Sequence, residues 1–262
     1  MPELPDLHVF AENLTKLTAD KRIVSADIFS VRNVSAGIET LRSDWLDTCI
    51  AEIKRSGKEL YFHSASEKVF SVHLMLSGGF DVCTTAEAEA IPFKIMSMGF
   101  DDGTTLVISD YQSLCKVTLN PAEPLAPDAL SDAFTLERFL RSAARSKRKN
   151  IKAFIIDQSV VRGIGNAYAD EILWTAGISP ESTTGSIPEE KMAELYTAVG
   201  TVLTDAIVNI KRLSHDIIKG EERSFLKVHN SHKKRTDDGE PIIVRRIASK
   251  ITYFTAAQTL YK

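Results

Sequence analysis

The spacing of apolar residues predicts a helix near the start of the chain. Four apolar residues recur at intervals of three and four: Leu7, Phe10, Leu14 and Leu17. This spacing places them on one face of a helix from Asp6 to about Thr18, with Asp6 as the expected N-cap. A helix with one apolar face needs a partner, so we expect it to cover a sheet.

The pattern then changes to short runs rich in Val, Ile, Phe and Thr, which are typical of strands. These runs are Arg22–Ile28, Glu59–His63, Val69–Leu74, Gly79–Cys83, Phe93–Phe100, Thr104–Ile108 and Cys115–Leu119. The pair Asp102-Gly103 lies between two of them and is a hairpin-turn signal. We therefore expect a β-sandwich or barrel over residues 1–119, capped by the first helix.

Three prolines within Asn120–Pro127 exclude regular structure and indicate a linker over residues 120–131. Helical spacing follows in Leu136–Ser142, Ile151–Gln158, Asn166–Ala176 and Pro188–Leu213. Residues 132–225 are therefore expected to form a helical domain. Residues 226–262 end in strand-like alternation, interrupted by a polar Ala248–Lys250 that suits the tip of a small β-hairpin. The fold class is α+β.

Composition indicates where the protein is located and which partners it can bind. The 262 residues lack a long uninterrupted apolar run and a signal peptide, so we expect a cytoplasmic protein with no membrane association. The net charge of −3 gives no global sign of a nucleic-acid partner, but basic clusters at residues 147–152, 233–235 and 245–250 fall in the second half. The three cysteines are far apart and are expected to be reduced.

The N-terminus carries candidate chemistry. Removal of Met1 would expose the secondary amine of Pro2, whose pKa near 7.7–8.0 leaves a reactive neutral fraction at about pH 7. Such an amine can attack a sugar carbon to give an iminium, and Glu3 can donate and accept protons. Met-Pro is also a common protein start, so this dipeptide alone indicates little.

Further motifs join it in order. They are Met1–Asp6, Arg55–Leu60, Val72–Gly78, Asp110–Cys115 and Val161–Glu171. Each alone has a purely structural interpretation. Together they resemble the formamidopyrimidine-DNA glycosylase/endonuclease VIII family over nearly the full chain.

The resemblance implies a set of catalytic residues. Pro2 would be the nucleophile at the sugar of the damaged nucleoside, and Glu3 the acid/base that helps to open the ribose ring. Lys58 would reach the lesion nucleotide and its phosphate. Asp6 stands where the family usually has glutamate. A second carboxylate is therefore present, on a side chain that is one methylene shorter.

The resemblance also implies DNA contacts. His73 would contact a phosphate, and Leu76 would fill the gap left by a flipped base, a task for which any apolar wedge serves. In the loop at residues 110–115 the family's two arginines are absent. Gln112 and Leu114 remain to contact a base edge and to wedge. Asn166 would present its amide to a phosphate at a helix start.

The end of the chain departs from most of the family, which holds a zinc ion with four cysteines. Thr255 and Gln258 stand at the last two ligand positions, so we expect a zincless finger, no metal and no cofactor. Lys250 replaces the arginine of the hairpin and keeps its charge. The short segment between Phe225 and Gly239 favours oxidised pyrimidines, formamidopyrimidines or further-oxidised guanine as substrates over 8-oxoguanine.

The resulting expectation is a monomeric, nucleoid-associated base-excision-repair enzyme. It would remove oxidised bases from double-stranded DNA and nick abasic sites by β- and δ-elimination. The alternative from another class is a non-catalytic protein that binds damaged DNA with the same fold. A structural helix-two-turn-helix protein of the ribosomal type would not explain the N-terminus.

Overall fold

A computed structural model of the chain describes all 262 residues and divides them into two compact units. The first unit comprises residues 1–123 and 210–221, and the second comprises residues 124–209 and 222–262. The chain first passes from one unit to the other at Glu123 and Pro124, inside the proline-rich segment. No helix is both long enough and apolar enough to cross a membrane.

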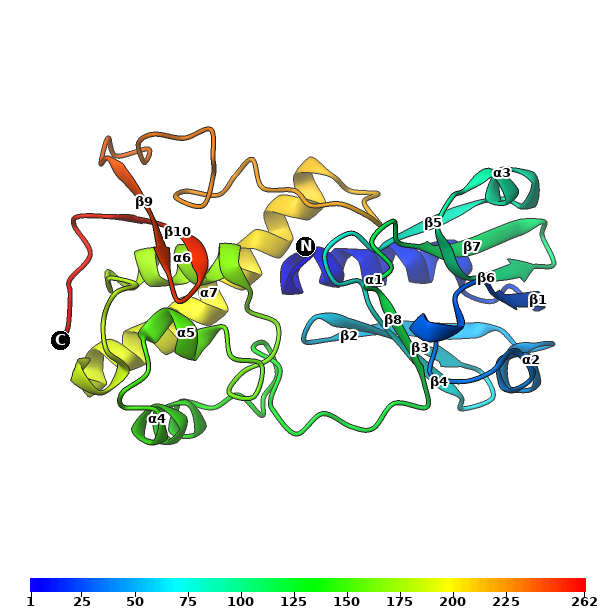
Figure 1. Cartoon of the computed structure of the whole chain (residues 1–262), viewed down its shortest axis with the longest axis horizontal. Coiled ribbons are helices and arrows are strands. Elements are labelled where there is room, and N and C mark those ends of the chain that lie inside the picture. Colours follow the sequence, from blue (N-terminus) through cyan, green and yellow to red (C-terminus); the bar gives the residue numbers. More distant parts are fainter. The chain divides into compact units, whose positions relative to one another are not determined.

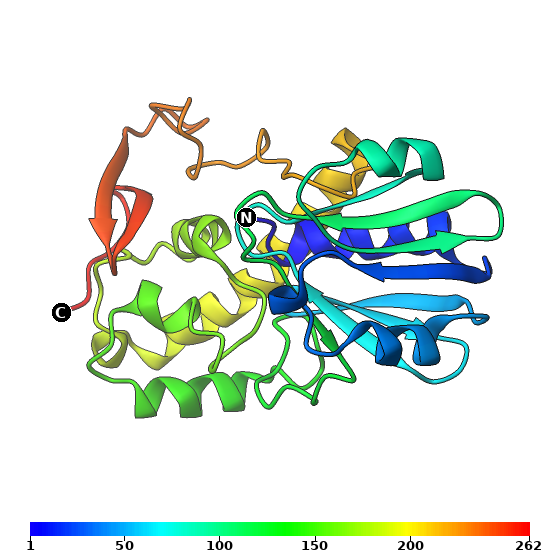
Figure 2. The same cartoon turned by 45° about the vertical axis from the view of Figure 1, so that its right-hand side comes forward.

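The first unit is a sandwich of two four-stranded antiparallel sheets, seen as two layers in Figure 2, which confirms the predicted sandwich. One sheet contains, in spatial order, β1 (Ile23–Ile28), β6 (Lys94–Phe100), β7 (Thr104–Ser109) and β5 (Gly79–Thr84). The other contains β2 (Ile50–Ser56), β3 (Glu59–Ser64), β4 (Val69–His73) and β8 (Lys116–Leu119). The helical elements of this unit are α1 (Leu4–Thr18), α2 (Ile38–Trp45), α3 (Thr85–Ala90) and the short 3-10 helix η1 (Val31–Asn33) (Figure 1).

Aromatic side chains fill the core of the first unit. Phe62 of β3 stacks on Phe70 of β4 with ring centroids 4.4 Å apart, and Trp45 meets Phe70 edge-on at 4.7 Å. The apolar face of α1 joins this core through Phe10 and Leu14, which are fully buried. Burial of α1 against β2 fixes the place of the N-terminus.

The start of α1 differs from the expectation. Glu3 is the N-cap, and Asp6 lies three residues further along, where its carboxylate accepts the backbone N–H of Glu3 at 2.9 Å. Pro5 is tolerated in this first turn because a proline needs no backbone donor there. The prediction of Asp6 as N-cap is therefore wrong, and Glu3 and Asp6 form a reciprocal capping box instead.

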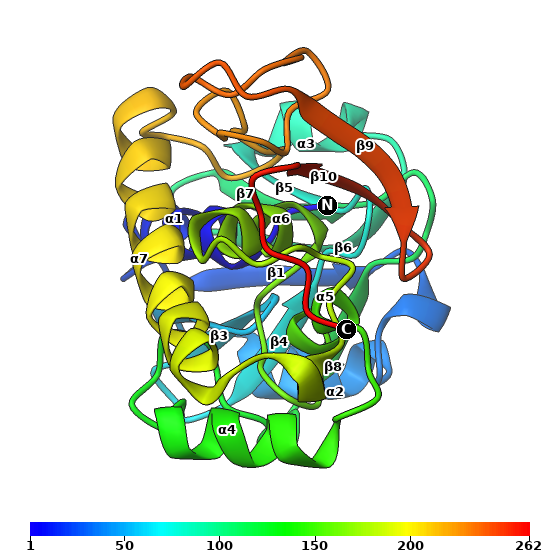
Figure 3. The same ribbon diagram turned by 90° about the vertical axis from the view of Figure 1, so that its left-hand side faces the viewer.

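The second unit is helical and ends in a two-stranded hairpin (Figure 3). Its elements are α4 (Leu136–Arg145), α5 (Ile151–Ile155), α6 (Asn166–Thr175), the short 3-10 helix η2 (Thr184–Ser186), α7 (Glu189–Leu213), β9 (Ile242–Ile247) and β10 (Lys250–Thr255). The last turn of α7, from Ile210, belongs to the first unit. Phe139 and Phe154 pack at 5.4 Å in the core, and β10 lies against α6.

The hairpin turn is tighter than expected. Ala248 and Ser249 alone form it, with φ of 49° and 64°, and Lys250 already belongs to β10, opposite Ile247. Two consecutive positive φ angles are the geometry of a two-residue hairpin turn. The placement of Lys250 in the tip is therefore corrected by one residue.

Candidate functional site

Pro2 is buried and lines a pocket of about 340 Å³ in the first unit. The other residues that line the pocket are Leu76, Ser77, Gly78, Gly79, Asp81, Ser109, Lys219, Gly220 and Glu221. They come from the loop after β4, from β5, from the end of β7 and from the segment that follows α7. The N-terminus thus opens onto a small pocket whose lining is largely polar.

Carboxylates surround this N-terminus. Glu3 and Asp6 are 3% and 0% exposed and are held by their capping box, and the amine of Met1 forms an ion pair with the carboxylate of Glu221. Asp81 pairs with Lys219 in the same pocket. An amine here is surrounded by groups that can accept protons and stabilise positive charge.

Lys58 lies on a different turn of the first unit. It follows Gly57, which adopts φ 62° between β2 and β3, and the guanidinium of Arg55 donates to the carbonyl of Gly57 at 3.2 Å. The positive φ explains the glycine in this motif. The side chain of Lys58 is half-buried.

Asp110 joins the two loops that carry the predicted wedge residues. One oxygen of its buried carboxylate accepts from the Ser77 hydroxyl and from the Gln112 N–H (3.0 Å). The other accepts the N–H groups of Leu114 and Cys115 at 2.6 and 2.7 Å. Burial alone would raise the pKa of Asp110, but these hydrogen bonds lower it below its usual value. Asp110 is thus a charged residue that organises both loops.

Both loops expose large apolar side chains. Leu76 is 56% exposed and Leu114 is 40% exposed, while Gln112 lies on the surface beside Tyr111. Both loops therefore present leucine side chains to solvent from a backbone that buried hydrogen bonds hold in place. Asp110 therefore brings together the loops that carry Leu76, Gln112 and Leu114.

The backbone of the Leu76 loop is strained at one position. Met75 has φ 56°, a left-handed conformation that residues other than glycine rarely adopt. Gly78 closes the loop by donating to the carbonyl of Leu74 at 3.0 Å, and an added Cβ would lie 2.5 Å from that oxygen. Only glycine fits there.

His73 ends β4 just before this loop. Its Nδ1 accepts the backbone N–H of Met75 at 3.1 Å, so in the neutral ring the proton lies on Nε2. That tautomer makes Nε2 a hydrogen-bond donor, as contact with a phosphate requires.

In the second unit, Gln158 holds the turn before α6. Its side chain accepts the N–H of Gly163 at 3.0 Å and donates to the carbonyl of Ile164 at 2.9 Å. Gly163 has φ 107°, which excludes most other residues. Asn166 begins α6, and its amide donates to the carbonyl of Ile251 in β10 at 2.9 Å. Its side chain therefore connects the helix start to the hairpin.

A buried charge network holds the hairpin against the helices. Lys152 of α5 and Asp170 of α6, both 0% exposed at their side chains, form an ion pair of 2.7 Å. Lys152 also donates to the Thr252 hydroxyl at 2.6 Å. Asp170 binds the His229 ring at 2.7 Å and accepts the Tyr253 N–H at 2.9 Å. Consecutive residues of β10, Thr252 and Tyr253, are thus bound to the helices.

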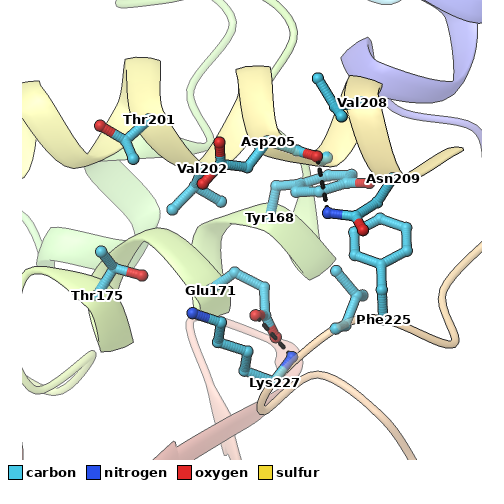
Figure 4. Close-up of a pocket in the computed structure, with 12 residues that line it drawn as sticks. Tyr168, Glu171, Thr175, Thr201, Val202, Asp205, Val208, Asn209, Phe225 and Lys227 are labelled. Carbon is cyan, nitrogen blue, oxygen red and sulfur yellow. Dashed lines mark hydrogen bonds between the residues drawn. The ribbon is translucent and has the colours of Figure 1, made fainter. Parts of the chain in front are cut away.

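Glu171, the next residue of α6, holds the segment after α7. It accepts the backbone N–H groups of Lys227, Val228 and His229 at 2.7–2.9 Å. Burial raises its pKa, an effect that these bonds oppose. Figure 4 shows Glu171, Lys227 and Phe225 at a pocket of about 330 Å³ beside α6 and α7. Glu171 therefore acts as a structural carboxylate.

The hairpin is closed without metal ligands. Gln258 accepts the Thr255 N–H at 2.8 Å and donates to the Ile178 carbonyl at 2.8 Å, and Phe254 is buried beneath it. Amide and hydroxyl groups are not the thiolate or imidazole donors that zinc requires. The residues present do not fit a zinc site. Lys250 is exposed at the start of β10.

Comparison with known proteins agrees with this arrangement. Residues 1–117 match the model of the formamidopyrimidine-DNA glycosylase N-terminal domain, and residues 125–216 match that of the formamidopyrimidine-DNA glycosylase H2TH domain. The formamidopyrimidine-DNA glycosylase of Enterococcus faecalis is 31% identical, covering 97% of this chain and 95% of that protein. The Lactobacillus helveticus enzyme of the same name is 30% identical over 79% of this chain and 78% of its own length.

Solved structures show the same fold. A crystal structure of a Lactococcus lactis Fpg mutant in complex with DNA containing Fapy-dG superposes with a TM-score of 0.87 at 25% identity. It covers 98% of this chain and 100% of that protein. A complex of LlFpg with THF-DNA and an inhibitor gives the same TM-score, identity and coverage.

Proposed function

The chain belongs to the formamidopyrimidine-DNA glycosylase family, and on that basis we propose that it is a base-excision-repair DNA glycosylase with Pro2 as nucleophile. The observation that carries the proposal is the place of Pro2, buried in a pocket among the carboxylates of Asp81 and Glu221 and next to Glu3. Because Pro2 is buried in a polar pocket, removal of Met1 would leave its amine as a reactive group held in one place.

The proposed reaction begins once Met1 has been removed. The Pro2 nitrogen bonds to C1′ of the damaged nucleoside while the N-glycosidic bond breaks and the base leaves with a proton. Glu3 protonates the ring oxygen as the ribose opens, which leaves an iminium between Pro2 and the sugar. Loss of a C2′ proton then expels the 3′ phosphate, a second elimination expels the 5′ phosphate, and water releases Pro2.

The remaining predicted residues are proposed to position the DNA. Lys58 would contact the lesion nucleotide and His73 a phosphate, consistent with the donor role of its Nε2. Contacts of this kind bind the DNA backbone without reading sequence. Asp6 supports the N-terminus through the capping box.

Leu76 and Leu114 would fill the space left by the flipped nucleotide, and Gln112 would meet the opposite base. Asn166 and Lys250 would contribute to phosphate binding by the second unit. Both residues belong to one region, because the Asn166 amide donates to the Ile251 carbonyl in β10 and Lys250 is the first residue of β10.

The proposed partner is double-stranded DNA with oxidised bases or abasic sites, bound by a monomer in the cytoplasm at the nucleoid. Oxidised pyrimidines, formamidopyrimidines and further-oxidised guanine are the proposed lesions, because the segment 225–239 is short. The missing arginines of the loop at residues 110–115 remove a reader of cytosine opposite the lesion.

Borohydride trapping tests the mechanism. An oligonucleotide duplex with an abasic site or an oxidised pyrimidine is incubated with the protein, whose N-terminal residue is first identified by mass spectrometry. We expect a covalent protein–DNA adduct that is lost in Pro2→Gly and strongly reduced in Glu3→Gln. Glu137→Gln, at a side chain 80% exposed on α4, is a matched control and should trap like the wild type.

Two results would overturn the proposal. One is the absence of an adduct with a chain that begins at Pro2. The other is an adduct that survives Pro2→Gly undiminished. Tight binding of the abasic duplex without an adduct would support the non-catalytic alternative.

A further inference from the structure

A segment far along the sequence completes the pocket around Pro2. Residues 210–221 follow the body of α7 yet belong to the first unit. The Asn13 amide of α1 donates to the carbonyls of His215 and Ile217 at 2.7 and 3.0 Å. Ile217 also packs against the core of the unit. The backbone that leads to Glu221 is therefore held against the helix that begins at the N-terminus.

Further contacts bind the end of this segment to the sheet. Lys219 forms an ion pair with Asp81 of β5, and its Cβ lies 3.3 Å from the point where a Cβ on Gly79 would stand. Glu221 follows two residues later and pairs with the amine of Met1. The backbone before Glu221 is therefore fixed, and it places the Glu221 carboxylate beside the N-terminal amine.

Removal of Met1 moves the amine by one residue, about 3.8 Å along the chain. Pro2 and Glu221 line the same pocket, so the Glu221 side chain can follow the amine. We propose that Glu221 is a positioning residue for the reaction: its carboxylate holds the protonated Pro2 amine and stabilises the iminium that replaces it. This inference rests on the proposed role of Pro2.

The charged groups around Pro2 determine whether the pKa of its amine is raised or lowered. Asp81 and Lys219 neutralise each other, and Glu3 and Asp6 are engaged in the capping box. Further along α1, His8 faces Arg55 of β2. Glu221, 32% exposed, is the carboxylate paired with the terminal amine. An adjacent negative charge raises the pKa of an amine and lowers the energy of a cationic intermediate.

The test is the pH dependence of single-turnover trapping on an abasic duplex at saturating enzyme, from pH 5.5 to 9.5. Trapping requires a neutral amine, so its rate rises with pH through the pKa of Pro2. In Glu221→Gln we expect the midpoint to move about 0.5–1 pH unit lower, the effect of one ion pair in a water-like dielectric. We also expect the plateau rate to fall about threefold to tenfold.

Glu221→Asp should restore most of both effects, because it keeps the charge. Glu137→Gln, at a side chain 80% exposed on α4, makes the same chemical change outside the pocket and should match the wild type. A Glu221→Gln profile that coincides with the wild type would overturn the inference while leaving Pro2 catalysis intact. If the wild type forms no adduct, the proposed function fails and takes the inference with it.

Discussion

Leu76 is a large apolar side chain held in water by a rigid loop. Its side chain is 56% exposed. The residues that follow it are fixed, because the N–H of Gly78 donates to the Leu74 carbonyl and the Ser77 hydroxyl donates to the Asp110 carboxylate. Exposed leucine contributes little to folding, so its role is expected to lie in binding.

Substitution of Leu76 separates these roles. Leu76→Ala should leave the free energy of unfolding within about 0.5 kcal/mol of the wild type. The same change should slow base removal from duplex DNA about tenfold, which corresponds to about 1.4 kcal/mol of lost wedge energy. Base release from a duplex and urea unfolding would measure the two effects. Leu125→Ala, at a leucine 96% exposed, is the control and should change neither; a duplex rate unaffected by Leu76→Ala would argue against the wedge.

Asp110 makes the loops sensitive to acid. Its pKa is lowered in the folded protein, so its contribution is present above the unfolded value of about 3.9 and is lost as the pH falls through the folded value. Asp110→Asn removes a charged acceptor and should lower the free energy of unfolding by about 2–4 kcal/mol at pH 7.

Urea unfolding at pH 7, 5 and 3 would follow this loss. The difference between Asp110→Asn and the wild type should shrink at pH 3, because the unfolded wild type takes up a proton below its pKa of about 3.9 while the folded carboxylate resists protonation. Asp216→Asn, at a side chain 86% exposed, should stay near zero throughout. A difference that is independent of pH would mean that the charge of Asp110 is not what stabilises the loops.

Helices and strands with a regular pattern of apolar residues could be predicted from the sequence, and those with an irregular pattern could not. The predicted runs correspond to all the strands of the sandwich except β2, whose alternation is broken by a bulge between Ile50 and Glu52. The helix α3 was not predicted. Its sequence does contain a signal for a helix start, because Thr84 and Glu87 have the spacing of a capping box. The helix α2 was missed because only two of its residues, Leu41 and Trp45, are buried.

The candidate site was predictable where its residues share a motif. Leu76 and Leu114 could be placed from short sequence patterns, and the structure brings their loops together. Glu221 could not, because its place depends on hydrogen bonds from Asn13 to a segment about 200 residues away. Asp110 was noted as part of a motif, but its role arises only from the fold of the two loops around it.

The link between hairpin and helices depends on one buried ion pair. Lys152→Met leaves the Asp170 carboxylate buried without its cation, and breaking such a pair costs about 3–5 kcal/mol. We expect this loss in urea unfolding, with faster hydrogen exchange of the backbone amides in β10. Lys191→Met breaks an exposed pair with Glu194 and should cost less than about 1 kcal/mol. Equal losses in the two variants would contradict the structural role of Lys152.

For the whole molecule, binding must overcome a net charge of −3. We therefore expect attraction to DNA to come from local basic side chains such as the exposed Lys250, and to depend on the release of counterions. The logarithm of the binding constant for an abasic duplex should fall linearly with the logarithm of the salt concentration.

Lys250→Gln should make this salt dependence shallower by about one unit of slope if its ammonium neutralises a phosphate. Fluorescence anisotropy at 50–200 mM KCl would give the slopes. Lys16→Gln, in the last turn of α1, is the matched control and should keep the wild-type slope. An unchanged slope for Lys250→Gln would remove this lysine from the DNA contacts.

The hydrogen bonds of Gln258 have a consequence for the conditions under which the protein works. Zinc-bound thiolates are attacked by peroxide and converted to sulfenic and higher acids, so a finger built on them can be damaged by the agents that oxidise DNA. A hairpin closed by the side-chain amide of Gln258 and backbone groups offers no such target. Burial raises the pKa of Cys115 to about 12 and also raises that of Cys83, which favours the thiol form of both over the more reactive thiolate. We therefore expect this chain to keep its shape during oxidative stress, when damaged bases accumulate fastest.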